Sequence, residues 1–183
     1  FPRNVQINYI CTATGVKHLH NKAIKYDIGV YFEQNGHGNV LFNKKPKHLE
    51  TFASFFHPNI GDGIMDFYAV LFMLQELKLS SEDWYDFYSS KHSILSKHDV
   101  QNKDVLKCTS NELKLTSPGF LQNYIDKQCK DNKCRAFVRA SGTENCVRLF
   151  VEGSDELANK MAHSKISRFI QKYMNNIIFN VKD

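Results

Sequence analysis

RAFVRASGTENCVRLFV, residues 135–151, is the stretch that decides the fold of the C-terminal half of the chain. Residues 135–139 and 147–151 are two runs rich in β-branched and aromatic side chains, as strands are. The loop between them, residues 140–144, is short and contains Gly142. The pattern predicts two neighbouring strands joined by this loop.

Helical patterns flank the two strands. Ser117 and Pro118 predict the start of one helix, with Ser117 as its cap. Ser154 is expected to cap a second, long helix with apolar residues at helical spacing, and residues 176–181 are typical of a last strand. The C-terminal half is therefore predicted to be a small α+β domain, an antiparallel sheet with helices on one face.

The N-terminal half mixes strand and helix patterns. Residues 5–9 alternate between apolar and polar, which is typical of a half-buried strand, and a helix follows Gly15. Residues 28–32 and 39–42 predict two more strands. Strand, helix and strand in this order favour an α/β domain.

The domain boundary is predicted from composition. Asp62 is expected to cap one helix, and residues 80–83 resemble a capping box before another. From residue 90 to 116 the chain becomes polar and rich in Ser, Lys and Asn. We therefore expect an α/β domain at residues 1–92 and the α+β domain at residues 93–183.

Composition limits the classes of function. The 183 residues are 42% hydrophobic, so a core can form, and no apolar run approaches the length of a membrane span. The net charge of +5 suits a small anionic partner, and the spread of basic residues does not favour nucleic-acid binding. Five cysteines without a secretory signal predict free thiols and a cytoplasmic protein. Because the chain begins at Phe1, we expect a fragment or a processed product.

The loop at residues 140–144 carries the groups of a phosphate site. Gly142 allows close approach to an anion, and Ser141 and Thr143 add hydroxyl donors. Arg139 and Arg148 add planar guanidinium groups that match phosphate oxygens. The alternative is an ordinary hairpin loop with exposed arginines.

Glu33, Asn35 and His37 form a second polar group, before the strand at residues 39–42. On a strand, Glu33 and Asn35 would point to one side and could bind adjacent sugar hydroxyls. His37, between glycines, is a candidate general acid or base near pH 7. A polar hairpin turn explains the same residues.

Thr14 and Gly15 mark a turn from strand to helix, where backbone N–H groups can bind an anion. A purely structural turn is the alternative. No metal site is predicted, because Cys129 and Cys134 lack a second pair of ligands at similar spacing.

Taken in order, the segments TGVKHLH (14–20), FEQNGHG (32–38) and RASGTE (139–144) resemble the α-D-phosphohexomutase superfamily. The resemblance extends over essentially the whole chain. It implies the third and fourth of four domains. It also implies that Glu33, Asn35 and His37 read the sugar and that Thr14 and Gly15 line the sugar site. The phosphate that is not transferred would be held by Arg139, Ser141, Gly142, Thr143 and Arg148.

The superfamily branch that this chain resembles most interconverts N-acetylglucosamine 6-phosphate and 1-phosphate, for UDP-N-acetylglucosamine synthesis. The resemblance implies a phosphoserine donor and a magnesium ion, but neither the serine loop nor the Asp-rich magnesium loop occurs in this sequence. We expect an inactive C-terminal fragment whose partners are the phosphosugar and the missing N-terminal domains, with the magnesium ligands outside this chain. Two positions depart from the pattern. Ala140 stands where the superfamily usually has a proline, and Ala13 stands where many members have a lysine, which leaves His37, Lys17 or a residue outside this chain as the candidate acid or base.

Two other functions stay open at this point. One is a non-catalytic phosphosugar-binding or regulatory module, favoured if the natural protein starts near Phe1. The other is a nucleic-acid-binding domain, which would require binding that weakens steeply with salt.

Overall fold

The computed structural model describes residues 5–176 of the chain. Backbone contacts divide the chain into two compact units, Phe1–Ser89 and Ser90–Asp183. We call these the first and the second unit, and each has a hydrophobic cluster of its own.

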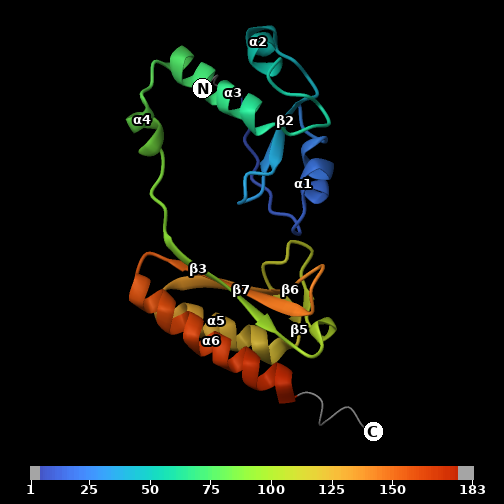
Figure 1. Ribbon diagram of the computed structural model, residues 1–183, viewed down its shortest axis with the longest axis vertical. Helices are drawn as coiled ribbons and strands as arrows, with labels where there is room; N and C mark the ends of the chain where they lie inside the picture. Colours follow the sequence, from blue (N-terminus) through green and yellow to red (C-terminus); the bar gives the residue numbers. More distant parts are fainter. Residues whose placement is uncertain (1–4, 177–183) are drawn as a thin grey trace. The chain divides into compact units, whose positions relative to one another are not determined.

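The second unit is a small α+β domain, as predicted. Its three main strands are antiparallel in the order β3-β7-β6, and two long helices cover one face of the sheet (Figure 1). The elements are β3 (His92–Asp99), η2 (Lys103–Val105), β4 (Lys107–Cys108), β5 (Leu115–Ser117), α5 (Gly119–Asn132), β6 (Cys134–Ala140), β7 (Cys146–Gly153) and α6 (Glu156–Asn176).

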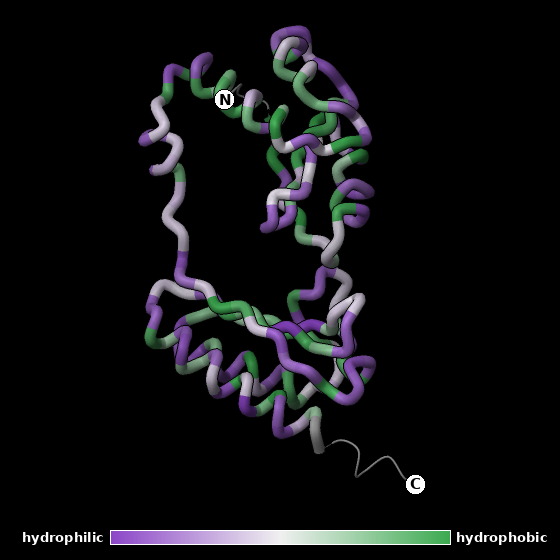
Figure 2. The backbone as a smooth tube through the Cα atoms, viewed as in Figure 1, coloured by the Kyte–Doolittle hydropathy of each residue, from purple (hydrophilic) through white to green (hydrophobic). Residues whose placement is uncertain are grey.

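The core of the second unit lies between the sheet and its helices. Val147, Leu149 and Val151 alternate along β7 and are fully buried, together with Ile125 of α5 and Ile166 of α6. Along α6 hydrophobic and hydrophilic segments alternate, as expected for a helix with one buried face (Figure 2). Within residues 90–176 no helix covers the other face of the sheet, and Arg148 in the middle strand belongs to that face because it alternates with the buried residues.

The two units divide between Ser89 and Ser90, where the polar segment predicted as a boundary begins. That segment contains β3, whose residues facing α6 are joined to it by hydrogen bonds of histidine, serine and asparagine. Two helix caps of this unit were predicted wrongly. Ser117 ends β5, and α5 begins at Gly119. The α6 cap is Asp155, whose carboxylate accepts the Ala158 N–H at 2.9 Å. Of the strand predicted at residues 176–181, Asn176 ends α6 and the rest lies outside the described residues.

The first unit differs from the α/β domain that its sequence predicts. In its described part, β1 (Ile28–Phe32) and β2 (Gly38–Phe42) form an antiparallel hairpin, and residues 5–9 form no strand. A strand needs a neighbour for its backbone groups, and here Val5 and Ile7 are 56% and 54% exposed. The unit also contains α1 (Val16–Ala23), η1 (Lys47–Leu49), α2 (Glu50–Ala53), α3 (Gly63–Leu77) and α4 (Ser81–Tyr85).

Helix caps in the first unit agree with prediction. The Asp62 carboxylate accepts the N–H groups of Ile64 and Met65 at the start of α3. Ser80 and Asp83 form a reciprocal capping box at the start of α4. Both caps satisfy backbone donors that a helix leaves unpaired at its first turn.

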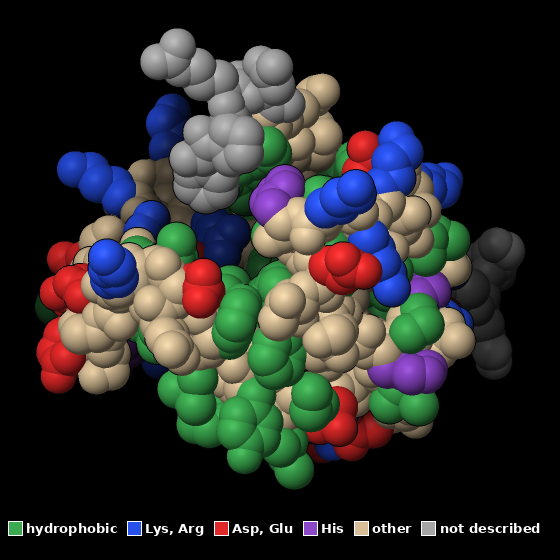
Figure 3. Space-filling view, turned by 90° about the horizontal axis from the view of Figure 1, so that it is seen from above, with side chains coloured by type: hydrophobic (Ala, Val, Ile, Leu, Met, Phe, Trp, Pro, Cys, Tyr) green, Lys and Arg blue, Asp and Glu red, His purple; other side chains and the backbone are tan. Residues whose placement is uncertain are grey.

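Apolar side chains remain on the surface of the first unit. On α3, Phe67 and Tyr68 are more than half exposed, and Tyr85 and Tyr88 at α4 are 82% and 76% exposed. The view from above shows a patch of apolar side chains (Figure 3). None of the helices in residues 5–176 is both long and apolar enough to cross a membrane.

Candidate functional site

The β6–β7 loop (residues 141–145) is held by hydrogen bonds among its own residues and by one lysine. The Ser141 N–H donates to the Cys146 carbonyl at 2.9 Å, and the hydroxyl of buried Ser141 accepts the Glu144 N–H at 3.3 Å. Lys103 Nζ donates to the carbonyls of Ser141 at 2.6 Å and Glu144 at 2.9 Å. Two carbonyls of the loop, those of Ser141 and Glu144, are thus turned toward Lys103.

The top of the loop is open. Within residues 5–176, the amide N–H groups of Gly142 and Thr143 donate to no protein acceptor. A Cβ placed on Gly142 would meet nothing within 4 Å, so an anion can approach the backbone there. Ser141 shapes the loop from inside, whereas Gly142 and Thr143 are exposed to a ligand.

Three cations form a row beside the loop. Arg148 of β7 lies directly opposite Lys97 of β3 and Arg139 of β6. Residues directly opposite on neighbouring strands point to the same face of a sheet, here the face without helices. The row therefore presents Lys97, Arg148 and Arg139 side by side at the end of the sheet that carries the loop.

Two carboxylates form ion pairs with the three cations of this row. Glu144 Oε1 lies 2.7 Å from Lys97 Nζ, and Glu144 Oε2 lies 3.3 Å from Arg148 Nη2. Glu112 Oε2 lies 3.9 Å from Arg139 Nε. The hydrogen bond to Lys97 and its charge, followed by Arg148, lower the pKa of Glu144, so the carboxylate is ionised at neutral pH. The same pair raises the pKa of Lys97.

In the first unit, the predicted sugar-binding residues come together at two turns. The Gly15 N–H at the start of α1 donates to Glu33 Oε1 at 3.0 Å, which joins the Thr14-Gly15 turn to the end of β1. Gly15 has φ of +122°, a conformation that favours glycine. Lys17 lies exposed in the first turn of α1. Glu33 is therefore positioned by a backbone amide 18 residues before it.

The prediction that Glu33 and Asn35 alternate on a strand was wrong. β1 ends at Phe32, and both residues belong to the turn between β1 and β2. Asn35 Oδ1 accepts the His37 N–H at 3.0 Å, and Gly36 has φ of +87°. Side-chain bonds of this kind stabilise turns in place of strand pairing. His37 is exposed on this turn.

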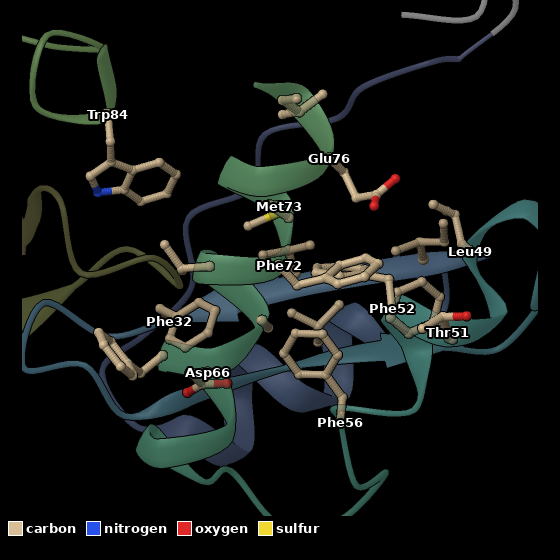
Figure 4. Close-up of a pocket in the computed structure, with 18 of the residues that line it drawn as sticks. Phe32, Leu49, Thr51, Phe52, Phe56, Asp66, Phe72, Met73, Glu76 and Trp84 are labelled. Carbon is tan, nitrogen blue, oxygen red and sulfur yellow. The ribbon is translucent and has the colours of Figure 1, made fainter. Parts of the chain in front are cut away.

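The large pocket of the first unit is a different feature. It has a volume of about 1220 Å³ and lies between α3 and the β1–β2 hairpin, with Phe32, Phe52, Phe72 and Trp84 among its lining (Figure 4). Its acidic groups are Asp66 and Glu76, and burial followed by the charge of Asp62 raises the pKa of Asp66. An apolar lining with acidic groups repels a phosphate, so we do not assign a phosphosugar to this pocket.

Metal ligands do not gather in the described residues. Within residues 5–176 no three His, Cys, Asp or Glu side chains are placed to hold a metal ion. Magnesium prefers several oxygen ligands, so this part of the chain does not fit a magnesium site.

Sequence reasoning missed Lys97 and Lys103. Both lie in the polar segment interpreted as a boundary, about forty residues before the loop that they contact. Burial alternates along residues 92–98, but the buried face carries the polar residues His92, Ser96 and His98, so the sequence shows no apolar–polar alternation there.

Comparison with known proteins places both units in one family. Residues 1–49 match the family description "Phosphoacetylglucosamine mutase AMG1, domain III", and residues 121–165 match "Phosphoglucomutase/phosphomannomutase, C-terminal domain". The phosphoacetylglucosamine mutase of Candida albicans is 40% identical over 165 residues, 80% of this chain and 30% of the relative. The human phosphoacetylglucosamine mutase is 36% identical over 87% of this chain and 33% of the relative.

A solved structure agrees with the sequence matches. Aspergillus fumigatus N-acetylphosphoglucosamine mutase, in complex with GlcNAc-6P and magnesium, superposes with a TM-score of 0.83 at 32% identity. The match covers 91% of this chain and 34% of that protein. The chain thus spans about a third of the length of the relatives it matches. It belongs to the phosphoacetylglucosamine mutase family of the α-D-phosphohexomutases and corresponds to the C-terminal portion of its relatives.

Proposed function

We propose that this chain is the sugar-reading and phosphate-holding part of a mutase that interconverts N-acetylglucosamine 6-phosphate and N-acetylglucosamine 1-phosphate, the step that feeds UDP-N-acetylglucosamine synthesis. The names of its relatives support this reaction. The ligands named for the Aspergillus fumigatus structure support the substrate.

The observation that carries the proposal is the open top of the β6–β7 loop. Gly142 and Thr143 present amide donors beside Arg139 and Arg148, and a phosphate is the anion that uses several donors at once. Ser141 holds the loop in this shape from inside, through the Glu144 N–H. In this proposal the loop binds the phosphate that is not being transferred.

The first unit is proposed to read the sugar. Glu33, fixed by the Gly15 N–H, offers a carboxylate to sugar hydroxyls, and Asn35 lies two residues further in the same turn. We propose that Thr14 lines the sugar site with Gly15. His37 is the candidate general acid or base, with Lys17 as the weaker candidate.

We propose that residues 1–92 and 93–183 correspond to the third and fourth domains of the family. In a longer chain the third domain would become an α/β domain, with residues 5–9 as a strand beside a sheet formed by earlier residues. The exposed apolar side chains of α3 and α4 support a further covering element.

We propose that the phosphoryl donor and the magnesium ligands lie in the part of the relatives that this chain does not match, so that the chain alone transfers no phosphoryl group. Turnover of N-acetylglucosamine 6-phosphate by the purified chain, with magnesium and a bisphosphate primer, would contradict this assignment. The five free cysteines favour a cytoplasmic location.

The test of the binding proposal is calorimetric titration of the chain with N-acetylglucosamine 6-phosphate. Arg139→Ala should weaken binding by about 1.5–3 kcal/mol, the range for hydrogen bonds to charged groups. Arg168→Ala, which removes an exposed arginine of α6, is the matched control and should leave affinity unchanged. Unchanged affinity in a folded Arg139→Ala, Arg148→Ala double variant would overturn the proposal.

A further inference from the structure

The row of Lys97, Arg148 and Arg139 is an unusual arrangement for a sheet. Like charges directly opposite on neighbouring strands destabilise a sheet, and here three cations follow one another across three strands. Lys97 and Arg148 have 49% and 39% of their side chains exposed, so both can reach a ligand on the face without helices.

Glu144 occupies the space between two of these cations. One carboxylate oxygen contacts Lys97 at 2.7 Å and the other contacts Arg148 at 3.3 Å. A carboxylate that uses its two oxygens in this way makes the contacts that two oxygens of a phosphate would make. Because the side chain of Glu144 is 43% exposed, these ion pairs are screened by solvent and are easily exchanged.

Lys103 has a different role from Lys97. Its ammonium donates to two loop carbonyls, so it positions the loop. Lys97, in contrast, contacts only carboxylates among the described residues, those of Glu144 and of Asp99 at 3.8 Å. An incoming anion can therefore take the place of these carboxylates beside the Lys97 ammonium.

We propose that Lys97 is a phosphate-binding residue of this site and that Glu144 is its resident counter-ion, which a bound phosphate displaces from Lys97 and Arg148. This inference rests on the proposed function of the β6–β7 loop. A dianionic phosphate offers more charge and more oxygens than the carboxylate it replaces. A singly charged anion gains little by the exchange, so the site selects dianionic phosphate esters.

The test is calorimetric titration with inorganic phosphate and with N-acetylglucosamine 6-phosphate at constant ionic strength and pH. Lys97→Met should weaken binding of both ligands about three- to tenfold, whereas Lys97→Arg, which keeps the charge, should retain most of it. The control is Lys160→Met, which removes a lysine paired with Glu156 on α6 and should change nothing.

Glu144→Gln should strengthen phosphate binding about threefold or more, because Lys97 and Arg148 lose their competing anion. Glu156→Gln removes the same charge from α6 and should leave the affinity unchanged. Unchanged or weaker binding in Glu144→Gln, or unchanged binding in folded Lys97→Met, would overturn the inference.

The Arg139→Ala variant distinguishes a failure of the inference about Lys97 from a failure of the proposed phosphate binding by the loop. If Arg139→Ala weakens binding and Lys97→Met does not, the loop binds phosphate without Lys97 and only the inference fails. If neither substitution has an effect, the proposed function of the loop fails as well.

Discussion

The two units of the chain bury their apolar side chains to very different degrees. In the second unit, one cluster joins the sheet to both long helices, and Leu149 and Ile166 have no exposed surface. In the first unit, the buried cluster consists of Ala23, Tyr31 and Leu41. The second unit therefore closes a hydrophobic core of its own, whereas the first unit leaves much of its apolar surface exposed.

The largest difference between the units is expected from truncation of one leucine in each, the buried Leu149 and the half-exposed Leu71. Leu149→Ala in β7 should destabilise the second unit by about 2–5 kcal/mol, because it leaves a cavity in a closed core. Leu71→Ala in α3 should cost about 1 kcal/mol or less, because Leu71 is already 44% exposed. Urea unfolding followed by resonances of each unit measures both changes. Equal losses would show that the first unit has a closed core too.

A smaller effect on stability is expected from pH in the second unit. His98 Nε2 lies 2.9 Å from the hydroxyls of Ser96 and Ser167, and His163 Nε2 lies 2.7 Å from that of Ser96. Burial, followed by the nearby His163, lowers the pKa of His98 against the opposing effect of Asp99. Burial also lowers the pKa of His163.

Because both folded-state pKa values lie below the ordinary value of about 6.5, the unfolded chain takes up protons first as the pH falls. The contribution of the two neutral histidines to the free energy of unfolding is therefore complete above about pH 6.5 and decreases as the pH falls below that value. Urea midpoints of the second unit between pH 7.5 and 5.5 measure the loss, and a His98→Gln, His163→Gln variant should show a flatter profile. A wild-type midpoint that stays constant or rises on acidification contradicts the assignment.

The sequence predicts the second unit better than the first for a physical reason. The strands around residues 135–151 and the two helices bury their apolar side chains against each other, so periodicity indicates their structure. β3 was missed because His92, Ser96 and His98 on its buried face use hydrogen bonds in place of apolar contacts. Residues 5–9 have the pattern of a strand, but the described chain supplies no neighbouring strand.

The same contrast holds for the candidate site. Arg139, Ser141 and Gly142 stand next to one another in sequence, so a local motif indicates them. Lys97 and Lys103 reach the loop only through strand pairing and folding, and no local pattern indicates such a contact. The sequence indicates Glu33 as a candidate sugar-binding residue. It does not indicate the hydrogen bond of Glu33 to the Gly15 amide, because that bond depends on the packing of α1 against β1.

The measurement that tests the central claim most directly is an NMR titration of the ¹⁵N-labelled chain with inorganic phosphate. Our account predicts saturable downfield shifts of the Gly142 and Thr143 amide protons, because these two open donors bind the anion. N-acetylglucosamine 6-phosphate, which carries the same phosphate group, should produce the same shifts. If the Gly142 and Thr143 resonances do not move while other amides shift and saturate, phosphate binds elsewhere and the account is wrong.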